Sequence, residues 1–331
     1  MQNKNPCSIQ IFKALKLGIV LFLGLAPLAI SSESTPMKVL LIGWDGVRAD
    51  ALQQAYTPHF DSLIRNGSYS DSCWSVLPSR SGPGWTSILT GVSPAKHGVT
   101  DNKLSTWKVK EHPGLTRRLR EAGYLGRIAS VTHWAPLAQL NWEADYVIDF
   151  PSDSSVEVQA RQLLSQTENS PDFLFLHFDD ADHAGHTFGF HPYMPPYRLA
   201  LEHLDQRLGR ILATLKSRQN YDSEHWLICI TSDHGGHYRH HGDDVPEDRR
   251  TFLLVQGPGI ELGSRLGLAH SEDVLPTIMA FLGIRENALV YFDGIPRGIS
   301  LERRFANFPV LENSVYKPSV YSESPIFQQA R

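Results

Sequence analysis

The sequence contains few cysteines, three among its 331 residues. Cys7 lies ahead of an apolar N-terminal run, so only Cys73 and Cys229 would remain in a chain that had lost this run. Cys229 stands inside the apolar stretch WLICIT, which predicts a buried free thiol. We therefore expect no disulfide framework, and the 41% of hydrophobic residues must supply a core instead.

A strong net charge is also missing. The formal charge is −4, and removing residues 1–31, which hold three lysines and no acidic residue, changes it to −7. Tight binding of nucleic acid depends on Lys and Arg side chains that neutralise backbone phosphates. A mildly acidic chain is therefore not expected to hold nucleic acid as a stable partner, whereas a small phosphate-ester substrate is compatible with it.

Long apolar runs are absent from the sequence except near its N-terminus. Lys4, Lys13 and Lys16 precede the run LGIVLFLGLAPLAI (17–30), and small residues follow it. This order is typical of a secretory signal peptide, and the run is short for a membrane span. We predict a signal peptide over residues 1–31 and a secreted or periplasmic protein without a stable membrane span. A signal anchor that is not cleaved is the alternative.

Internal repeats, low-complexity tracts and Gly/Ser linkers are absent as well, which predicts one domain over residues 37–310 and a polar C-terminal tail over 311–331. Short apolar runs have the composition of buried strands at residues 38–44, 173–178, 226–231 and 251–257. Helical patterns lie between them, such as the leucine-rich stripe of residues 201–215. This alternation predicts an α/β fold with a doubly wound, mostly parallel sheet and helices on both faces.

Carboxylate and imidazole side chains follow three of the predicted strands: Asp45 after the first, Asp182 and His186 after the second, Asp233 and His234 after the third. Ligands bind at the carboxyl ends of the strands in such sheets, and Asp oxygens with His nitrogens are ligands that zinc accepts. Each feature alone has another interpretation, as a turn, a surface charge pair or a solvated histidine-rich loop. Together they predict a centre of two divalent metal ions, which suits in-line displacement at phosphorus.

The stretch SGPGWTSILTGVSPAKHGVTDN (81–102) and the motif DHAGHTFG (182–189) carry a family resemblance. The chain resembles the alkaline phosphatase superfamily, and most closely its nucleotide pyrophosphatase/phosphodiesterase-like branch of type I phosphodiesterases. In that branch a threonine nucleophile stands nine residues before a Thr-Gly pair, and Ser81 occupies this position here. Ser79 and Thr86 do not fit the spacing. A helix that begins near Ser81 would favour its alkoxide, although the side chain could also serve only as a helix cap.

The resemblance implies that Ser81 is the nucleophile and that Asn102 donates a hydrogen bond to a phosphoryl oxygen. It also implies the ligands of two zinc ions, which are Asp45, Ser81, Asp233 and His234 for one ion, and Asp182, His186 and a last histidine for the other. We assign the last histidine to His241, because the interval from His241-Gly242 to Gly257-Pro258-Gly259 matches the branch. His270 is the alternative.

The implied function is that of a zinc-dependent phosphoesterase, phosphodiesterase- or nucleotide pyrophosphatase-like, that hydrolyses a small phosphate ester through a phosphoseryl intermediate. Only six residues separate His234 from His241, where larger enzymes of the branch carry a long insertion, which puts nucleotide specificity in doubt. A phosphomonoesterase, sulfatase or phosphonate hydrolase of the same superfamily is the alternative, although Trp85 stands where the sulfatase modification motif has an arginine. A non-catalytic secreted metal-binding protein would not need Ser81 and Asn102 at these spacings.

Overall fold

The four apolar runs form strands, as predicted. They are β1 (Met37–Trp44), β5 (Phe173–Phe178), β6 (His225–Thr231) and β7 (Arg250–Gln256). The computed structural model describes residues 35–141, 143–284 and 292–299. The predicted signal peptide over 1–31 and the predicted tail over 311–331 lie outside these residues, and the limits 37–310 of the catalytic domain stay a prediction.

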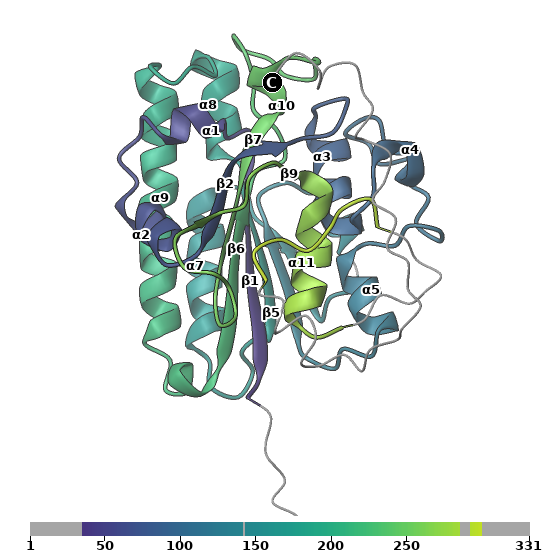
Figure 1. Ribbon diagram of the computed structural model, residues 1–331, viewed down its shortest axis with the longest axis vertical. Helices are drawn as coiled ribbons and strands as arrows, with labels where there is room; N and C mark the ends of the chain where they lie inside the picture. Colours follow the sequence, from purple (N-terminus) through teal and green to yellow (C-terminus); the bar gives the residue numbers. More distant parts are fainter. Residues whose placement is uncertain (1–34, 142, 285–291, 300–331) are drawn as a thin grey trace, which may run out of the picture. The chain divides into compact units, whose positions relative to one another are not determined.

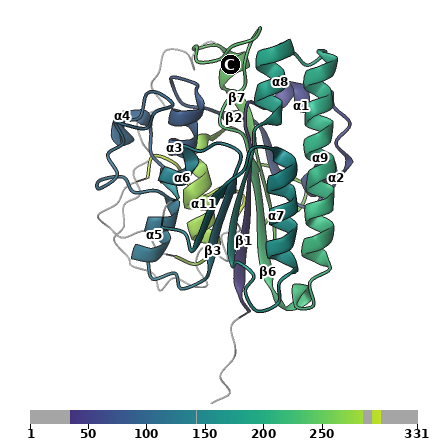
Figure 2. The ribbon, with the colours of Figure 1, turned by 180° about the vertical axis from the view of Figure 1, so that it is seen from behind.

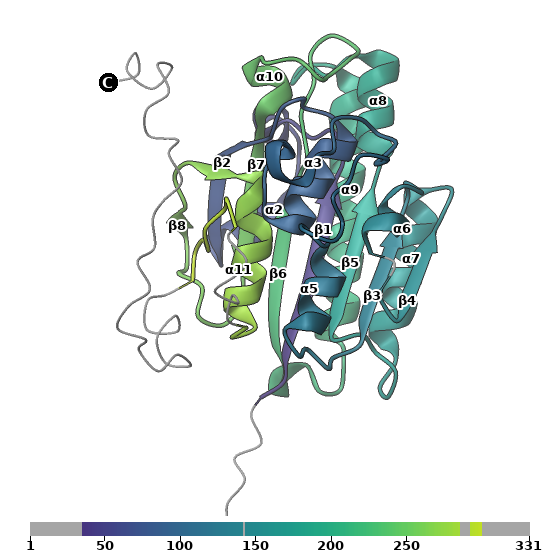
Figure 3. The ribbon, with the colours of Figure 1, turned by 90° about the vertical axis from the view of Figure 1, so that its right-hand side faces the viewer.

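The strands of the described residues form one nine-stranded sheet in the order β4-β3-β5-β1-β6-β7-β2-β8, with β9 also paired to β2 (Figure 3). The strands not foreseen from the sequence are β2 (Ser68–Trp74), β3 (Ile128–Thr132), β4 (Tyr146–Asp149), β8 (Ser264–Arg265) and β9 (Ala269–His270). β1 pairs in parallel with both β5 and β6, and β3 pairs in parallel with β4 and β5. β7 runs antiparallel to β6 and to β2. The predicted mostly parallel sheet is therefore confirmed.

Helices cover both faces of this sheet, again as predicted (Figures 1 and 2). One face carries α1 (Ala49–Leu52), α2 (Pro58–Arg65), α7 (Asp153–Ser165), α8 (Asp180–Phe188) and α9 (Pro195–Lys216). The other carries α3 (Ser81–Thr90), α4 (Pro94–His97), α5 (Leu115–Glu121), α6 (Leu137–Leu140) and α11 (Val274–Phe281). Shorter elements are α10 (Pro246–Arg249) and two 3₁₀ turns, η1 (Tyr221–Ser223) and η2 (Ser271–Asp273).

Strand β1 shows why two separate helical layers are needed. Its side chains alternate, so that Leu40 and Ile42 join the apolar core under α7 and α9, whereas Val39 and Leu41 join the core under α3, α5 and α11. Successive side chains of a strand point to opposite faces, and an all-apolar strand must be covered on both. The continuous apolar run of β1 thus places it at the centre of the sheet.

Helix α3 approaches β1 closely because Gly43 lacks a side chain. A Cβ atom at Gly43 would collide with the ring of Trp85, which is fully buried on α3. Glycine is the residue that permits such contact between a backbone and a large side chain. This contact fixes the start of α3 next to the carboxyl end of β1.

Cys73 and Cys229 are both buried and form no disulfide, in agreement with the prediction. Burial raises the pKa of the Cys229 thiol to about 12, so this thiol stays protonated and unreactive near neutral pH. No helix of the described residues is both long and apolar enough to cross a membrane.

Candidate active site

Two neighbouring strands, β1 and β6, bring Asp45, Asp233 and His234 together at their carboxyl ends. The backbone N–H of Gly46 donates to Asp233 Oδ1 at 3.3 Å, which ties the two strand ends to each other. His234 Nε2 lies 3.4 Å from Asp45 Oδ1 and 3.4 Å from Asp233 Oδ2. We call Asp45, Asp233 and His234 the first ligand group.

A second group forms on α8, which follows β5. Asp182 and His186 stand four residues apart on this helix, and His186 Nε2 lies 3.3 Å from Asp182 Oδ2. His241 completes the group, with its Nε2 atom 3.2 Å from His186 Nε2 and 3.9 Å from Asp182 Oδ1. The two groups adjoin, because the rings of His234 and His241 stack with 3.8 Å between their centroids.

Backbone carbonyls orient all three of these histidines. The Nδ1 atom of His186 lies 2.9 Å from the carbonyl of Arg239, that of His241 lies 3.0 Å from the carbonyl of Ser79, and that of His234 lies 2.7 Å from the carbonyl of Gly235. A carbonyl only accepts, so each Nδ1 carries the proton of the neutral ring and each Nε2 keeps a lone pair. The facing Nε2 atoms of His186 and His241 then need a cation or a further proton between them.

One oxygen of each of three carboxylates in the site also lacks a hydrogen-bond partner among the described residues. Asp45 Oδ1, Asp182 Oδ1 and Asp233 Oδ2 are buried and accept no hydrogen bond from the described residues. Burial raises the pKa of Asp45 to about 7, with the nearby Asp182 adding to the effect. Burial, with Asp45 and Asp182, also raises the pKa of Asp233 well above its ordinary value. Such acceptors are expensive to bury alone, whereas a divalent cation would allow Asp45 and Asp233 to ionise beside Asp182.

The histidines of the two groups differ in their protonation. Burial lowers the pKa of His234 to about 4, so its ring is neutral at pH 7. Burial also lowers the pKa of His241. His186 behaves in the opposite way, because its hydrogen bond to Asp182 raises its pKa to about 9. Burial would raise the pKa of Asp182, yet the hydrogen bond from His186 and the nearby His234 and His241 hold it below its ordinary value.

These observations agree with the chemistry of a metal centre. The sets Asp45, Asp182 and His234, and Asp182, His186 and His241, each place three ligand atoms within 4.8 Å of one another. The donor atoms are oxygen and imidazole nitrogen, which suit zinc and related ions. The structure therefore contains residues that fit two divalent ions.

Ser81 is the first residue of α3, in agreement with the predicted helix start. Its side chain is nearly buried, with 7% of the residue exposed, and its Oγ atom lies 3.2 Å from His234 Nε2. The hydroxyls of Ser79 and Thr86 point elsewhere: Ser79 Oγ donates to the Asp243 carbonyl at 2.9 Å, and Thr86 Oγ1 donates to the Gly82 carbonyl at 2.6 Å. Ser81 therefore brings its hydroxyl to the first ligand group at a helix N-terminus, which favours negative charge.

Asn102 lies next to Ser81 through a backbone contact. The N–H of Gly82 donates to Asn102 Oδ1 at 2.9 Å, which fixes the amide and leaves its Nδ2 group available as a donor. A Cβ atom at Gly82 would collide with the Asp101 carbonyl, so glycine is required for this close approach. The exposed amide of Asn102 thus stands beside Ser81.

Two residues that contact Asp45 were not foreseen from the sequence. Trp85 Nε1 donates to Asp45 Oδ2 at 2.8 Å, and His177 Nε2 lies 3.0 Å from the same oxygen. His177 is on β5, where it is paired with Gly43 of β1. The only available hint was a histidine inside the otherwise apolar run FLFLHF.

His270, the alternative last ligand, lies in another part of the fold. It stands on β9 beside Trp74 of β2, and the charges that act on it belong to Asp273, Arg297 and Arg249. His241 rather than His270 therefore lies beside Asp182 and His186.

Residues 39–245 match the family model described as type I phosphodiesterase / nucleotide pyrophosphatase. The chain belongs to this family. Among curated relatives, the bis(5′-adenosyl)-triphosphatase ENPP4 of Bos taurus is 25% identical over 227 residues, which cover 62% of the present chain and 49% of the relative. The venom phosphodiesterase CdcPDE of Crotalus durissus collilineatus is 23% identical, over 70% of the chain and 30% of the relative. The chain thus spans half or less of the length of these type I phosphodiesterase relatives.

Solved structures show the same fold. Murine ectonucleotide pyrophosphatase/phosphodiesterase 5, as an inactive variant in complex with AMP, superposes with a TM-score of 0.64 at 16% identity and covers 75% of this chain and 96% of its own. A 2-O GAG sulfatase superposes with a TM-score of 0.64 at 15% identity, over 80% of this chain and 73% of its own. The α/β architecture is therefore common to both groups of enzymes.

Proposed function

We propose that this chain is a phosphoesterase that hydrolyses a small phosphate ester, with a phosphodiester or pyrophosphate bond as its preferred substrate, through a phosphoseryl intermediate on Ser81. The observation that carries the proposal is the position of the Ser81 hydroxyl, 3.2 Å from His234 Nε2 at the edge of a cluster of buried carboxylates, three of whose oxygens accept no hydrogen bond from the described residues. Membership of the type I phosphodiesterase family and the named activities of its relatives support it.

Two divalent ions, zinc by the chemistry of the donor atoms, complete the proposed site. Asp45, Ser81, Asp233 and His234 would hold one ion, and Asp182, His186 and His241 would hold the other. When bound, the ions would lower the pKa of the serine hydroxyl and neutralise charge on the phosphoryl group.

The residues of the chain then account for the steps of the reaction. Ser81 Oγ loses its proton and forms a bond to phosphorus while the bond to the ester oxygen on the opposite side breaks, and that oxygen leaves with a proton from water. Water then cleaves the bond between Ser81 and phosphorus, which restores the hydroxyl and releases a phosphate that keeps any second ester group. The Asn102 amide, fixed by Gly82, is placed to donate to a phosphoryl oxygen as negative charge builds on it. The N-terminus of α3 adds partial positive charge at the same place.

Arg80, directly before Ser81, supports an anionic substrate. Its guanidinium lies near His241 and Gly242, and no carboxylate of the described residues forms an ion pair with it. A cation beside the nucleophile favours a negatively charged ester and can contact a second phosphate group. The named triphosphatase and the AMP complex among the relatives make a nucleotide ester the first substrate to test.

The test compares aryl phosphate monoester, phosphodiester and sulfate substrates at equal concentration, with the full chain loaded with zinc. We expect the diester to react fastest. A dominant monoester rate would instead assign the chain as a phosphatase, and a dominant sulfate rate would assign it as a sulfatase.

Two variants of Ser81 test the nucleophile. Ser81→Ala should lose turnover while its bound zinc stays measurable, whereas Ser81→Thr keeps a hydroxyl and should retain part of the activity. Acid quenching of wild type during turnover of the diester should yield, on the peptide that contains Ser81, a phosphoryl group that keeps the ester substituent that did not leave. An active Ser81→Ala protein, or phosphate on another residue, would rule out this nucleophile.

We further propose a secreted or periplasmic location, on the basis of the charged and apolar N-terminal segment of residues 1–31. N-terminal sequencing of the protein recovered outside the cytoplasm tests this. A mature chain that still begins at Met1 would favour the signal-anchor alternative.

A further inference from the structure

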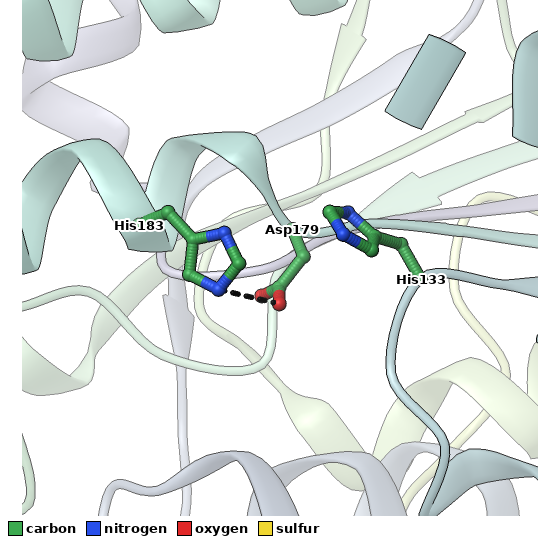
Figure 4. Close-up of side chains that lie close together, drawn as sticks. All are labelled: His133, Asp179 and His183. Atoms are coloured by element: carbon green, nitrogen blue, oxygen red, sulfur yellow. Dashed lines mark ion pairs between the residues drawn. The ribbon is translucent and has the colours of Figure 1, made fainter. Parts of the chain in front are cut away.

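A third group of metal-ligand side chains lies next to the candidate active site. His133 follows β3, Asp179 follows β5, and His183 stands on α8, and one ligand atom of each lies within 4.8 Å of the others. Figure 4 shows Asp179 between the two imidazoles, with its carboxylate directed at His183. His133 and Asp179 come from neighbouring strand ends, because β3 and β5 pair in the sheet. None of them belongs to the two ligand groups described above.

Asp153 holds this third group in place. It is fully buried at the start of α7, and its Oδ1 atom lies 2.7 Å from His133 Nδ1. The same oxygen accepts the backbone N–H of Asp179 at 2.8 Å, and its Oδ2 accepts the N–H of Asp180 at 3.1 Å. In metal sites, a carboxylate that binds the Nδ1–H of a histidine leaves Nε2 with its lone pair directed at the ion. His133 is therefore preorganised as a ligand.

The spacing of the group suits a small tetrahedral ion. His183 Nε2 lies 3.2 Å from Asp179 Oδ2, and the rings of His133 and His183 stand nearly perpendicular with 5.6 Å between their centroids. Metal bonds of about 2.0–2.2 Å in tetrahedral geometry place ligand atoms roughly 3.3–3.6 Å apart. The Asp179 and His183 atoms are already close to this separation, and the exposed His183 side chain can adjust.

The side chains behind Asp179 provide a second reason to place positive charge here. Asp45, His177 and Asp179 also have ligand atoms within 4.8 Å of one another, and all three are buried. The Nε2 atom of His177 lies 3.0 Å from Asp45 Oδ2. Its Nδ1 atom is buried and has no hydrogen-bond partner among the described residues. Asp45 and Asp179 are thus two buried carboxylates beside one imidazole, and a cation bound at Asp179 would reduce the repulsion between them.

We propose that His133, Asp179 and His183 bind a third divalent ion of the zinc type, with Asp153 as the residue that orients His133. Two imidazoles and one carboxylate form a three-residue set that is common for zinc and leaves a fourth position open to water. The side chain of His177 would then lie between Asp179, a ligand of this ion, and Asp45. The third site is separate from the proposed catalytic reaction and does not require that reaction to be correct.

The alternative is an ordinary ion pair between Asp179 and His183, which are four residues apart on one helix turn. An ion pair of this kind does not require the Asp153–His133 contact, and it binds no metal. The two explanations therefore differ in the number of zinc ions that the chain holds.

The experiment counts zinc in the full chain. Wild type and variants are stripped with a chelator, dialysed to equilibrium against buffered zinc, and analysed for bound metal per chain. His183 is suitable for substitution because 61% of its side chain is exposed, so His183→Ala is not expected to affect folding. His203→Ala is the matched control, since His203 is an exposed histidine on α9.

We expect His183→Ala and His133→Ala each to bind one zinc ion fewer than wild type, and His203→Ala to bind the wild-type number. Asp153→Asn should keep the site but weaken it by about 10- to 100-fold. Equal zinc content in wild type and His183→Ala would overturn the proposal.

A second comparison separates this site from the active site. In an Asp182→Asn background, which removes an active-site ligand, His183→Ala should still remove one zinc ion. If the difference disappears in that background, the zinc lost from His183→Ala belonged to the active site, and the proposal is wrong. The count does not depend on turnover, so it stands or fails independently of the proposed phosphoesterase activity.

Discussion

Replacement of Trp85 by phenylalanine would remove a single donor from the candidate metal centre. The Trp85 indole N–H donates to Asp45 Oδ2 at 2.8 Å, and the residue is fully buried. Among the described residues, Asp45 Oδ2 would retain only His177 as a hydrogen-bond partner. Because Asp45 is a proposed zinc ligand, the substitution should weaken zinc binding although Trp85 does not contact the ion itself.

The magnitude follows from the kind of bond that is lost. A hydrogen bond to a charged group contributes about 1.5–3 kcal/mol. Loss of a partner that orients a metal ligand lowers metal affinity by about 10- to 100-fold. This factor equals about 1.4–2.7 kcal/mol of binding free energy. At a fixed concentration of free zinc well above the dissociation constant, the stabilisation that zinc gives to the folded chain should fall by the same amount.

The assay measures urea unfolding of each protein with buffered zinc and with chelator, and takes the difference in the free energy of unfolding. Trp107→Phe is the matched control, because the Trp107 indole donates to the His112 carbonyl at 2.9 Å rather than to a carboxylate of the site. The control removes the same atoms and the same type of donor. Its zinc-dependent stabilisation should equal that of wild type.

The reasoning is refuted if Trp85→Phe and Trp107→Phe keep the same zinc-dependent stabilisation. That result would mean that the indole does not orient Asp45 for metal binding. A loss of stability that is equal with zinc and with chelator would have the same meaning, since it reports only on packing.

Three further substitutions test other parts of the structure. Asn102→Ala removes the amide held by Gly82 and should lower kcat by about 10²- to 10³-fold in steady-state assays; a loss below about tenfold contradicts its role. Gly43→Ala should destabilise the protein by about 1–3 kcal/mol, because the added methyl group collides with Trp85. The loss should be smaller in a Trp85→Phe background, which a double-mutant cycle by urea unfolding measures. Additive effects of the two substitutions would show that this collision is not the cause of the loss. Burial raises the pKa of Glu272 from 4.5 to about 7, so the folded chain keeps a proton that the unfolded chain releases, and stability falls as pH rises between these values. Glu272→Gln should therefore be more stable than wild type at about pH 8, by up to about 3 kcal/mol, and equal to it below the ordinary pKa of 4.5; equal urea midpoints in mildly alkaline buffer would contradict this.

The parts of the fold that followed from the sequence are those whose residues carry their own pattern. The run KVLLIGW is apolar on both faces, and it forms the central strand β1. The leucine stripe of residues 201–215 lies within α9. The spacing of Asp182 and His186 predicts one face of a helix, and α8 carries both. In each case the local sequence alone indicates which side chains share a face of the strand or helix.

Other features depend on contacts between distant segments. Strand β2 has the polar sequence SYSDSCW and forms through its pairing with the distant strands β7, β8 and β9. His177 acquires its role from the register of β5 against β1, which places it at Gly43 and within reach of Asp45. No periodicity in the sequence reports that register. The contact of Trp85 with Asp45 could not be predicted for the same reason, because it joins a helix to the end of a distant strand.

The order in which the site assembles follows from the position of β1 between β5 and β6. The hydrogen bond from Gly46 to Asp233 joins residues 187 positions apart, and Asp182 comes from a third segment between them. Contacts of such separation form slowly, because the chain must close long loops before they stabilise it. A metal ion would find its full set of ligands only after the three central strands have paired. Zinc is therefore expected to slow the unfolding of this protein while leaving its folding rate nearly unchanged. Metal binding would then stabilise the chain only after it has folded.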